Sequence, residues 1–474
     1  MLKIYKQSNL PKTFTQESSN EQEMHRYSFH GNKIHFISLG CPRNLVDSEV
    51  MLGILLKAGY EATELMQDAD FIVINTCGFL QASRNESMAT IEETLHNRKG
   101  TAKLIVTGCM VQTHSDEISN KFPRVDYMLG SGDVEGILKA VQSEEKGKEI
   151  TSAKSYLEAG EVPRRISTPK HFAYLKIAEG CRKRCAYCII PEIKGPLKSK
   201  SVLQVLKEFR TLITSGVKEI ILIAQDLGDF GKDVGYKRVD GLIHLIKEIL
   251  KEEGDFWLRL LYLYPDEITS ELIQLMKSDK RICPYLDMPI QHINNEILKS
   301  MHRATSKEEI IKTITELREE IPEISIRTSL IVGYPGETEE QFEELCQFLK
   351  EYPLDQVGIF KYSQEAKSRS FSLPNQISEE VKEKRHQRLM KIQQKIVEKL
   401  QAKKIGKTIV AIVEGYHPES KLLMQARHMG QCPDIDGMII INDGRKVKEF
   451  QQRYLVEITD VAGYDLIGRV ITNV

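Results

Sequence analysis

Short apolar runs that are typical of β-strands alternate with longer amphipathic stretches along most of the chain. Between residues 33 and 145, three such runs are separated by helical stretches such as 46–57 and 83–96. The runs are Ile34–Leu39, Ala69–Asn75 and Lys103–Thr107. Because strands that alternate with helices favour a parallel sheet, residues 33–145 are predicted to form a small parallel α/β domain.

The same alternation recurs six times between residues 165 and 377. The expected strands are 172–178, 219–224, 257–263, 285–289, 324–332 and 356–362. The expected helices are 202–214, 242–251, 271–277, 295–300, 308–318 and 339–350. Six strand–helix units are fewer than the eight of a closed TIM barrel, so we predict an incomplete (β/α)6 barrel of the same type.

The remaining segments have other patterns. Residues 1–32 are polar and lack the apolar segment of a signal peptide, so we expect a disordered tail. Residues 378–403 carry many charges and predict a linking helix with a solvated face. Residues 407–474 contain five short strand-like runs, which predict a five-stranded, OB-like β-barrel.

The overall charge gives little indication of a partner. The formal net charge is −1 over 474 residues, so any affinity for nucleic acid must be local. The apolar runs are far shorter than the ~18 residues that span a bilayer. Nine cysteines are an odd number, and reducing conditions would keep such thiols available as metal ligands. We therefore expect a cytoplasmic protein without a membrane segment.

Three of the cysteines lie on one short loop after the first expected barrel strand. Cys181, Cys185 and Cys188 are separated by three and then two residues. A closed zinc site needs four protein ligands, and this loop supplies three. A 4Fe–4S cluster fits better, because three thiolates hold three irons and leave the fourth open. The spacing, with Tyr187 before the last cysteine, resembles the cluster loop of radical S-adenosylmethionine (SAM) enzymes, which implies that SAM binds the open iron.

Three further cysteines each follow an expected strand of the first domain. They are Cys41, Cys77 and Cys109, separated by 36 and 32 residues, and each has a glycine beside it. Parallel strands bring their carboxyl ends to one edge of a sheet, and glycine allows close approach of the backbone. Taken singly, such thiols are more often buried core residues. Their identical placement favours a second cluster with three protein ligands.

Polar residues also follow the expected strands of the barrel, at the edge where sites on such barrels lie. The candidate contacts of SAM are Tyr187, Gln225, Asp226, Gln291, Arg327 and Gly333. SAM has an ammonium, a carboxylate, a ribose and an adenine. Its site therefore needs hydrogen-bond acceptors, a cation for the carboxylate, and backbone that can approach the ligand closely. Four of these candidates have an ordinary alternative: Gln225 and Asp226 could cap a helix, Arg327 could pair with a barrel carboxylate, and Tyr187 could simply pack.

Three motif blocks together resemble the methylthiotransferases of the radical SAM class, from about Lys33 to the end of the chain. They are Gly40–Glu49, the cysteine loop and Asp287–His292. The first block is similar to that of the branch called RimO, which modifies protein twelve of the small ribosomal subunit. Residues 407–474 resemble the TRAM domain.

The resemblance implies two 4Fe–4S clusters with different roles. The auxiliary cluster, on Cys41, Cys77 and Cys109, would receive the sulfur, and the cluster on the cysteine loop would cleave SAM. SAM would serve as methyl donor and as the source of a radical that opens an unactivated C–H bond on the β-carbon of an aspartate. An electron donor and a source of sulfur are implied as partners.

Two other functions remain possible from the sequence: a tRNA adenosine methylthiotransferase and a non-enzymatic iron–sulfur electron carrier. A carrier would favour clusters with four protein ligands each. Residues 407–474 hold eight Lys and Arg against nine Asp and Glu, which argues against nucleic acid as the dominant partner. Asp434, Asp436 and Asp443 could instead dock a basic ribosomal protein, although aspartates are also common turn residues.

Overall fold

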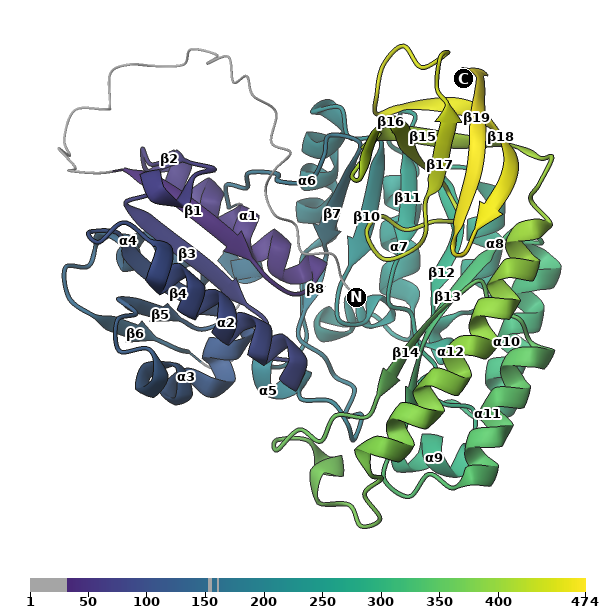
Figure 1. Ribbon diagram of the computed structural model, residues 1–474, viewed down its shortest axis with the longest axis horizontal. Helices are drawn as coiled ribbons and strands as arrows, with labels where there is room; N and C mark the ends of the chain where they lie inside the picture. Colours follow the sequence, from purple (N-terminus) through teal and green to yellow (C-terminus); the bar gives the residue numbers. More distant parts are fainter. Residues whose placement is uncertain (1–31, 152–155, 160–161) are drawn as a thin grey trace. The chain divides into compact units, whose positions relative to one another are not determined.

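The computed structural model describes residues 32–151, 156–159 and 162–474 (Figure 1). The expected disordered tail, apart from Asn32, lies outside the described residues. The described chain forms two compact units. The first runs to Pro169 and also includes Glu192–Gly195, and the second comprises Lys170–Pro191 and Pro196–Val474.

The first unit is built on a six-stranded parallel sheet with strand order β2-β1-β3-β4-β5-β6. Its strands are β1 (Lys33–Ser38), β2 (Glu61–Ala62), β3 (Phe71–Thr76), β4 (Lys103–Gly108), β5 (Tyr127–Leu129) and β6 (Gly147–Glu149). Its helices are α1 (Pro42–Lys57), α2 (Gln81–Asn97), α3 (Cys109–Lys121) and α4 (Ile137–Gln142). The parallel α/β fold expected for this region is confirmed.

Helices cover both faces of this sheet. Phe71 and Val73 of β3 pack with residues of α1 and α4, while Ile72 and Ile74 pack with residues of α2 and α3. Because neighbouring residues of a strand point to opposite faces, a strand between two helical layers must be apolar throughout. This explains the continuous apolar run of β3 and fixes the direction in which its carboxyl end points.

The second unit contains an open parallel sheet curved into a partial barrel, with strand order β14-β13-β12-β11-β10-β7 (Figure 1). The strands are β7 (Phe172–Lys176), β10 (Glu219–Ile223), β11 (Trp257–Leu260), β12 (Ile282–Asp287), β13 (Ser325–Val332) and β14 (Gln356–Lys361). The main helices are α6 (Val202–Thr214), α7 (Asp240–Ile249), α8 (Ser270–Ser278), α9 (Asn295–Ser300), α10 (Lys307–Glu320) and α11 (Glu339–Glu351). The incomplete barrel is thus confirmed.

A small antiparallel pair, β8 (Ala178–Glu179) and β9 (Lys198–Ser199), brackets the cysteine loop and the short helix α5 (Ile190–Lys194).

The last part of the chain closes into a five-stranded barrel with strand order β15-β16-β17-β19-β18. Its strands are β15 (Thr408–His417), β16 (Ser420–His428), β17 (Ile439–Asp443), β18 (Gln452–Ala462) and β19 (Asp465–Asn473). Closure leaves these strands without a free edge. The five-stranded barrel expected from the sequence is confirmed.

Helix α12 (Glu379–Ala402) differs from the expected solvated linker. It packs against β14 and α11 of the partial barrel and against β18 of the last barrel. The buried stripe that makes these contacts repeats every four residues: Arg385, Leu389, Gln393, Val397 and Gln401. Because the stripe is narrow and contains polar residues, the charge pattern of the sequence did not indicate a buried face. Within the described residues, no helix is both long enough and apolar enough to cross a membrane.

Candidate active site

Three cysteines of the first unit lie at the carboxyl ends of three neighbouring strands. Cys77 directly follows β3, Cys109 follows β4 as the first residue of α3, and Cys41 lies between β1 and α1. Strands β1, β3 and β4 are adjacent and parallel, so their following loops meet at one edge of the sheet. The structure therefore brings together three cysteines that 36 and 32 residues separate in sequence.

Glycine allows these loops to touch. Gly40 has a φ of 92°, and a Cβ added to it would lie 3.1 Å from the sulfur of Cys77. A Cβ added to Gly78 would lie 2.7 Å from the backbone nitrogen of Met110, beside Cys109. A side chain at either position would push the cysteine loops apart.

Asn44, in the first turn of α1, ties the loops to one another. Its side-chain amide donates hydrogen bonds to the carbonyls of Leu39, at 3.2 Å, and Thr76, at 3.0 Å. Its side-chain oxygen lies 3.4 Å from the sulfur of Cys109. The side chain is almost completely buried. One residue thus fixes the spacing of all three cysteine loops.

The three thiols differ in acidity. Burial raises the pKa of Cys41, but Arg43 and backbone N–H groups at the start of α1 outweigh burial, and the net pKa is lowered. Burial raises the pKa of Cys109 to about 12, against a lowering contribution from Lys194. Burial also raises the pKa of Cys77. Because a metal binds the thiolate, Cys41 is the most readily available ligand of this triad.

The cysteine loop of the second unit is held by the barrel. The backbone N–H of Cys188 donates to the carbonyl of Cys185 at 3.1 Å, which makes a tight turn. The N–H of Ala186 donates to the carbonyl of Met301 at 2.9 Å, and the carbonyl of Ala186 accepts from Ser370 at 2.9 Å. The loop is therefore fixed from two sides by main-chain hydrogen bonds of the protein itself.

Both sets of cysteines fit a cluster better than a single ion. Among the described residues, neither triad has all three sulfurs within 4.8 Å of one another. Thiolates on one zinc ion, at ~2.3 Å each, would be less than ~4.6 Å apart. The thiolates of a 4Fe–4S cluster bind different irons and are spread more widely. The geometry and the sulfur-only donors fit a cubane with one open iron at each triad.

Buried polar groups follow the end of β10, close to the cysteine loop. Oε1 of Gln225 is buried and has no hydrogen-bond partner among the described residues. Asp226 accepts from the N–H of Gly228 at 3.1 Å, its other oxygen lies 3.7 Å from Nζ of Lys183, and its carboxyl also faces that of Glu267. Buried polar atoms normally have partners, so these acceptors fit the polar groups of a bound cofactor.

Three other candidates have structural contacts of their own. Gln291 has a φ of 71° and pairs with Leu330 through backbone hydrogen bonds, which places it beside β13. Gly333 has a φ of 72°, and a Cβ on it would collide with Lys382 of α12. Tyr187 packs against a buried cluster that includes Met301, Tyr334 and Tyr362. These structural contacts explain in part why each of the three residues lies where it does.

Arg327, an expected contact of the cofactor, has carboxylate partners of its own in the structure. Its guanidinium lies 3.1 Å from Asp287 and 3.5 Å from Asp436. Arg327 is the third of the eight residues of β13 and pairs in register with Asp287, the last residue of β12. Sequence alone could not show that these carboxylates already satisfy its charge.

The predicted role of Asp436 as a docking charge is wrong, because the residue is buried. Its side chain is 1% exposed, and it accepts hydrogen bonds from the hydroxyl of Tyr285 and the backbone N–H of Cys432, both at 2.8 Å. It joins the last barrel to the partial barrel and is not an exposed docking charge. Asp443 is partly exposed, but it pairs with Arg445 at 2.7 Å.

Four residues near the cysteines had not been identified from the sequence. Lys194, in the first unit, lies 3.1 Å from Asp47 and 3.3 Å from the carbonyl of Ser131. The other three surround the cysteine loop of the second unit: Lys183, Tyr264 and Arg303. Lys183 lies between Cys181 and Cys185 in sequence, which was an available signal, whereas Lys194 follows the cysteines of the other triad. Tyr264 and Arg303 are distant in sequence and carried none.

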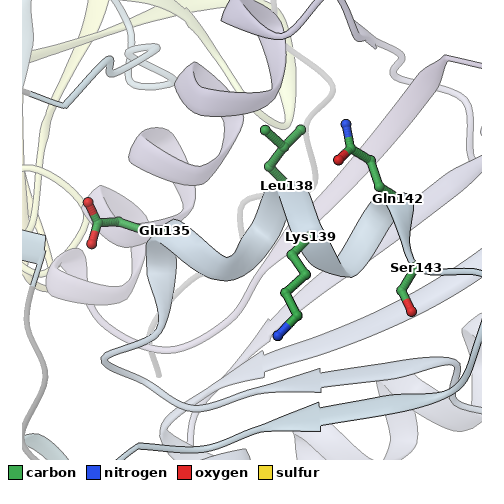
Figure 2. Close-up of a pocket in the computed structure, with 5 residues that line it drawn as sticks. All are labelled: Glu135, Leu138, Lys139, Gln142 and Ser143. Carbon is green, nitrogen blue, oxygen red and sulfur yellow. The ribbon is translucent and has the colours of Figure 1, made fainter. Parts of the chain in front are cut away.

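The first unit also has a surface hollow beside α4 (Figure 2). Its lining residues lie along α4 and beside it: Glu135, Leu138, Lys139, Gln142 and Ser143. Figure 2 shows these side chains on α4 and just before and after it, without a common centre. The one cation, Lys139, is 3.2 Å from Glu149. The hollow contains none of the cysteines, so it is not the candidate site.

Comparison with known proteins agrees with this division of the chain. Three family models match: the uncharacterized protein family UPF0004 over residues 33–130, the radical SAM superfamily over 175–349 and the TRAM domain over 405–471. Among solved structures, the radical SAM methyltransferase TsrM from Kitasatospora setae matches with a TM-score of 0.53. It covers 72% of this chain and 74% of its own length at 13% identity, so it supports the fold alone.

The partial barrel, its three-cysteine loop and the superfamily match define a radical SAM enzyme, with 4Fe–4S clusters and SAM as cofactors. Two curated relatives share most of its length, and both are named ribosomal protein uS12 methylthiotransferase RimO. The relative from Protochlamydia amoebophila is 70% identical over 94% of each chain. The relative from Chlamydia abortus is 57% identical over 96% of this chain and 99% of its own. The chain belongs to the RimO family of methylthiotransferases.

Proposed function

We propose that the protein adds a methylthio group to the β-carbon of an aspartate in ribosomal protein uS12. The observation that carries this proposal is the 70% identity to a relative named for that substrate, over 94% of both chains. Near-equal charge in the last barrel supports a protein substrate over tRNA, because it offers little attraction for a phosphate backbone.

The two cysteine triads divide the chemistry. Cys41, Cys77 and Cys109 hold an auxiliary 4Fe–4S cluster, and the triad on the barrel loop holds the cluster that binds SAM. When bound, these groups supply a methyl group, a sulfur site and a carbon radical able to open an unactivated C–H bond. Side-chain acids and bases cannot do this at neutral pH, because such a bond has no acidic proton.

The chain's own residues bind and orient SAM. Oε1 of Gln225 accepts from a polar group of SAM, because it is buried and has no hydrogen-bond partner among the described residues. Asp226, which Lys183 and Glu267 hold beside it, offers a second contact to SAM. Gln291, with its left-handed backbone beside β13, presents peptide groups at the same edge of the barrel. Tyr187 excludes water beside the cluster, which protects a reactive radical.

Three partners follow from this reaction. Reduction of the SAM-binding cluster needs an electron donor, and the methylthio group needs a source of sulfur. The third partner is uS12 itself, a basic protein to which Asp434 and Asp443 of the last barrel contribute weak steering. We place the enzyme in the cytoplasm, where ribosomal proteins are assembled and thiols remain reduced.

One experiment separates the proposal from its main alternative. Anaerobically reconstituted enzyme is incubated with SAM, a strong reductant and either uS12 or tRNA, and both products are weighed by mass spectrometry. The protein should gain the mass of one methylthio group in place of hydrogen, and the tRNA should be unchanged. A modified tRNA with unmodified uS12 would replace this proposal by the tRNA-modifying function.

A further inference from the structure

Arg303 is a buried cation aimed at a cluster cysteine. It follows α9, and its side chain is largely inaccessible to solvent. Its Nη1 lies 3.8 Å from the sulfur of Cys185, and its Nη2 donates to the carbonyl of Pro289. Its guanidinium stacks on the ring of Tyr264, with Cζ 3.9 Å from the ring centre. The arginine is therefore held rigidly against one sulfur of the barrel triad.

The charge of Arg303 has no carboxylate partner. Across residues 32–151, 156–159 and 162–474, no carboxylate oxygen lies within 4.0 Å of its nitrogens. Lys183, on the same loop as Cys185, makes a clear contrast, since its ammonium lies 3.0 Å from Glu267 and 3.5 Å from Asp266. An arginine does not lose its proton in proteins, and a buried charge is costly unless an anion is near.

Among the described residues, one neighbour of Arg303 can supply that anion. The groups around it are a carbonyl, the rings of Tyr187 and Tyr264, and Cys185. The phenol of a tyrosine is ordinarily neutral near pH 7, so neither ring supplies a negative charge. Cys185 becomes an anion when it binds iron as a thiolate. The hydroxyl of Tyr264, 3.5 Å from the same sulfur, provides a second polar contact to it.

We propose that Arg303, supported by Tyr264, is the charge-compensating residue of the SAM-binding cluster. Its guanidinium stabilises the Cys185 thiolate and, more strongly, the additional negative charge of the reduced cluster. Hydrogen bonds to cluster sulfurs and nearby positive charge raise the reduction potential. The inference rests on the proposed assignment of this cluster to Cys181, Cys185 and Cys188.

The test is a redox titration of the full-length protein with both clusters, followed by electron paramagnetic resonance. The signal of the SAM-binding cluster is identified by its change when SAM is added. In Arg303→Met the potential should become more negative, with at least a tenfold shift in the one-electron equilibrium, which corresponds to 59 mV. Arg303→Lys keeps the charge without the planar fork and should fall between this variant and the parent.

Arg184→Met is the matched control, because Arg184 directly precedes Cys185 but is exposed to solvent. Solvent screens its charge, so the potential should change little. Tyr264→Phe removes only the hydroxyl near the sulfur and should shift the potential in the same direction as Arg303→Met, by less. Iron content of each protein shows whether the cluster has been retained.

A normal potential in an iron-loaded Arg303→Met protein would overturn the inference. If that variant lost its iron, the test would rest on Tyr264→Phe and Arg303→Lys. A reduction potential equal to that of the parent protein in both variants would also overturn the inference. These results differ from failure of the proposed function, in which the parent protein itself would show no cluster that responds to SAM.

Discussion

Arg427 of the last barrel and Glu219 of the partial barrel form a buried ion pair, with Nη2 2.8 Å from Oε2 and side chains 3% and 0% exposed. Glu219 also lies 2.6 Å from Arg259, and Arg427 lies 2.6 Å from Glu414. Glu219 is the first residue of β10. The last barrel is therefore joined to the amino-terminal end of the partial barrel, away from the carboxyl ends where the cysteine loop lies.

The first prediction concerns this ion pair. Glu219→Gln leaves Arg259 and Arg427 without their shared carboxylate, and breaking a buried pair in this way costs about 3–5 kcal/mol. The free energy of unfolding in urea should fall by that amount. The control is Glu457→Gln, because Glu457 pairs with Arg469 on the surface, where such pairs contribute about 0–1 kcal/mol. Equal effects of the two variants would contradict the prediction.

The second prediction concerns pH. Burial raises the pKa of Glu219, but Arg259 and Arg427 outweigh burial and lower it from 4.5 to about 2. Since the folded pKa is the lower one, the stabilisation is present above about pH 4.5 and is lost as the pH falls toward 2. On the order of 3 kcal/mol should be lost over this range. Unfolding curves at several pH values measure the loss, and Glu219→Gln should lack this component.

The third prediction concerns Lys194 and Asp47 in the first unit, whose side chains are each 4% exposed. Asp47→Asn removes a carboxylate from a buried ammonium and should destabilise the unit by about 3–5 kcal/mol. Combining it with Lys194→Met should recover part of the loss, because the buried charge is removed too. A double-mutant cycle of unfolding free energies measures this coupling. Additive effects would show that the two residues do not act together.

The fourth prediction concerns iron. Two cubanes of four irons should give about eight irons per reconstituted chain. Replacing Cys181, Cys185 and Cys188 together by Ala should leave about four and abolish the cleavage of SAM to 5′-deoxyadenosine. Replacing Cys346 by Ala is the control, because this cysteine is buried in α11 and should bind no iron. About four irons in the parent protein would contradict two clusters.

Local patterns in the sequence were sufficient to predict the architecture. A continuous apolar run such as that of β3, followed by Cys77, is a short-range signal, and so are the three cysteines of the barrel loop. The short strands β2, β5 and β6 carry too few residues to show a period, and they were missed. The packing of residues 192–195 with the first unit could not be foreseen either, because nothing in their composition marks it.

Partners distant in sequence could not be predicted. One example is the buried group formed by Arg327 of β13, Asp287 of β12 and Asp436 of the last barrel. In the sequence, the charge of each residue would suit a ligand as well as it suits the other two residues. Only the folded chain shows that they satisfy one another. Arg303 is the opposite case, since its isolation from carboxylates becomes visible only when all of its neighbours are known.

The hydrogen bonds of Asn44 have a consequence for the order of assembly. They join the cysteine loops through protein atoms alone, to the carbonyls of Leu39 and Thr76, without a contribution from iron. We therefore expect the first unit to fold around its apolar core and its hydrogen-bonded cysteine loops before iron enters. A chelator should strip the metal and leave the secondary structure in place, unlike in zinc fingers, which unfold when the metal is removed. Damage to the auxiliary cluster by oxygen is, on this basis, repairable in a folded chain without resynthesis.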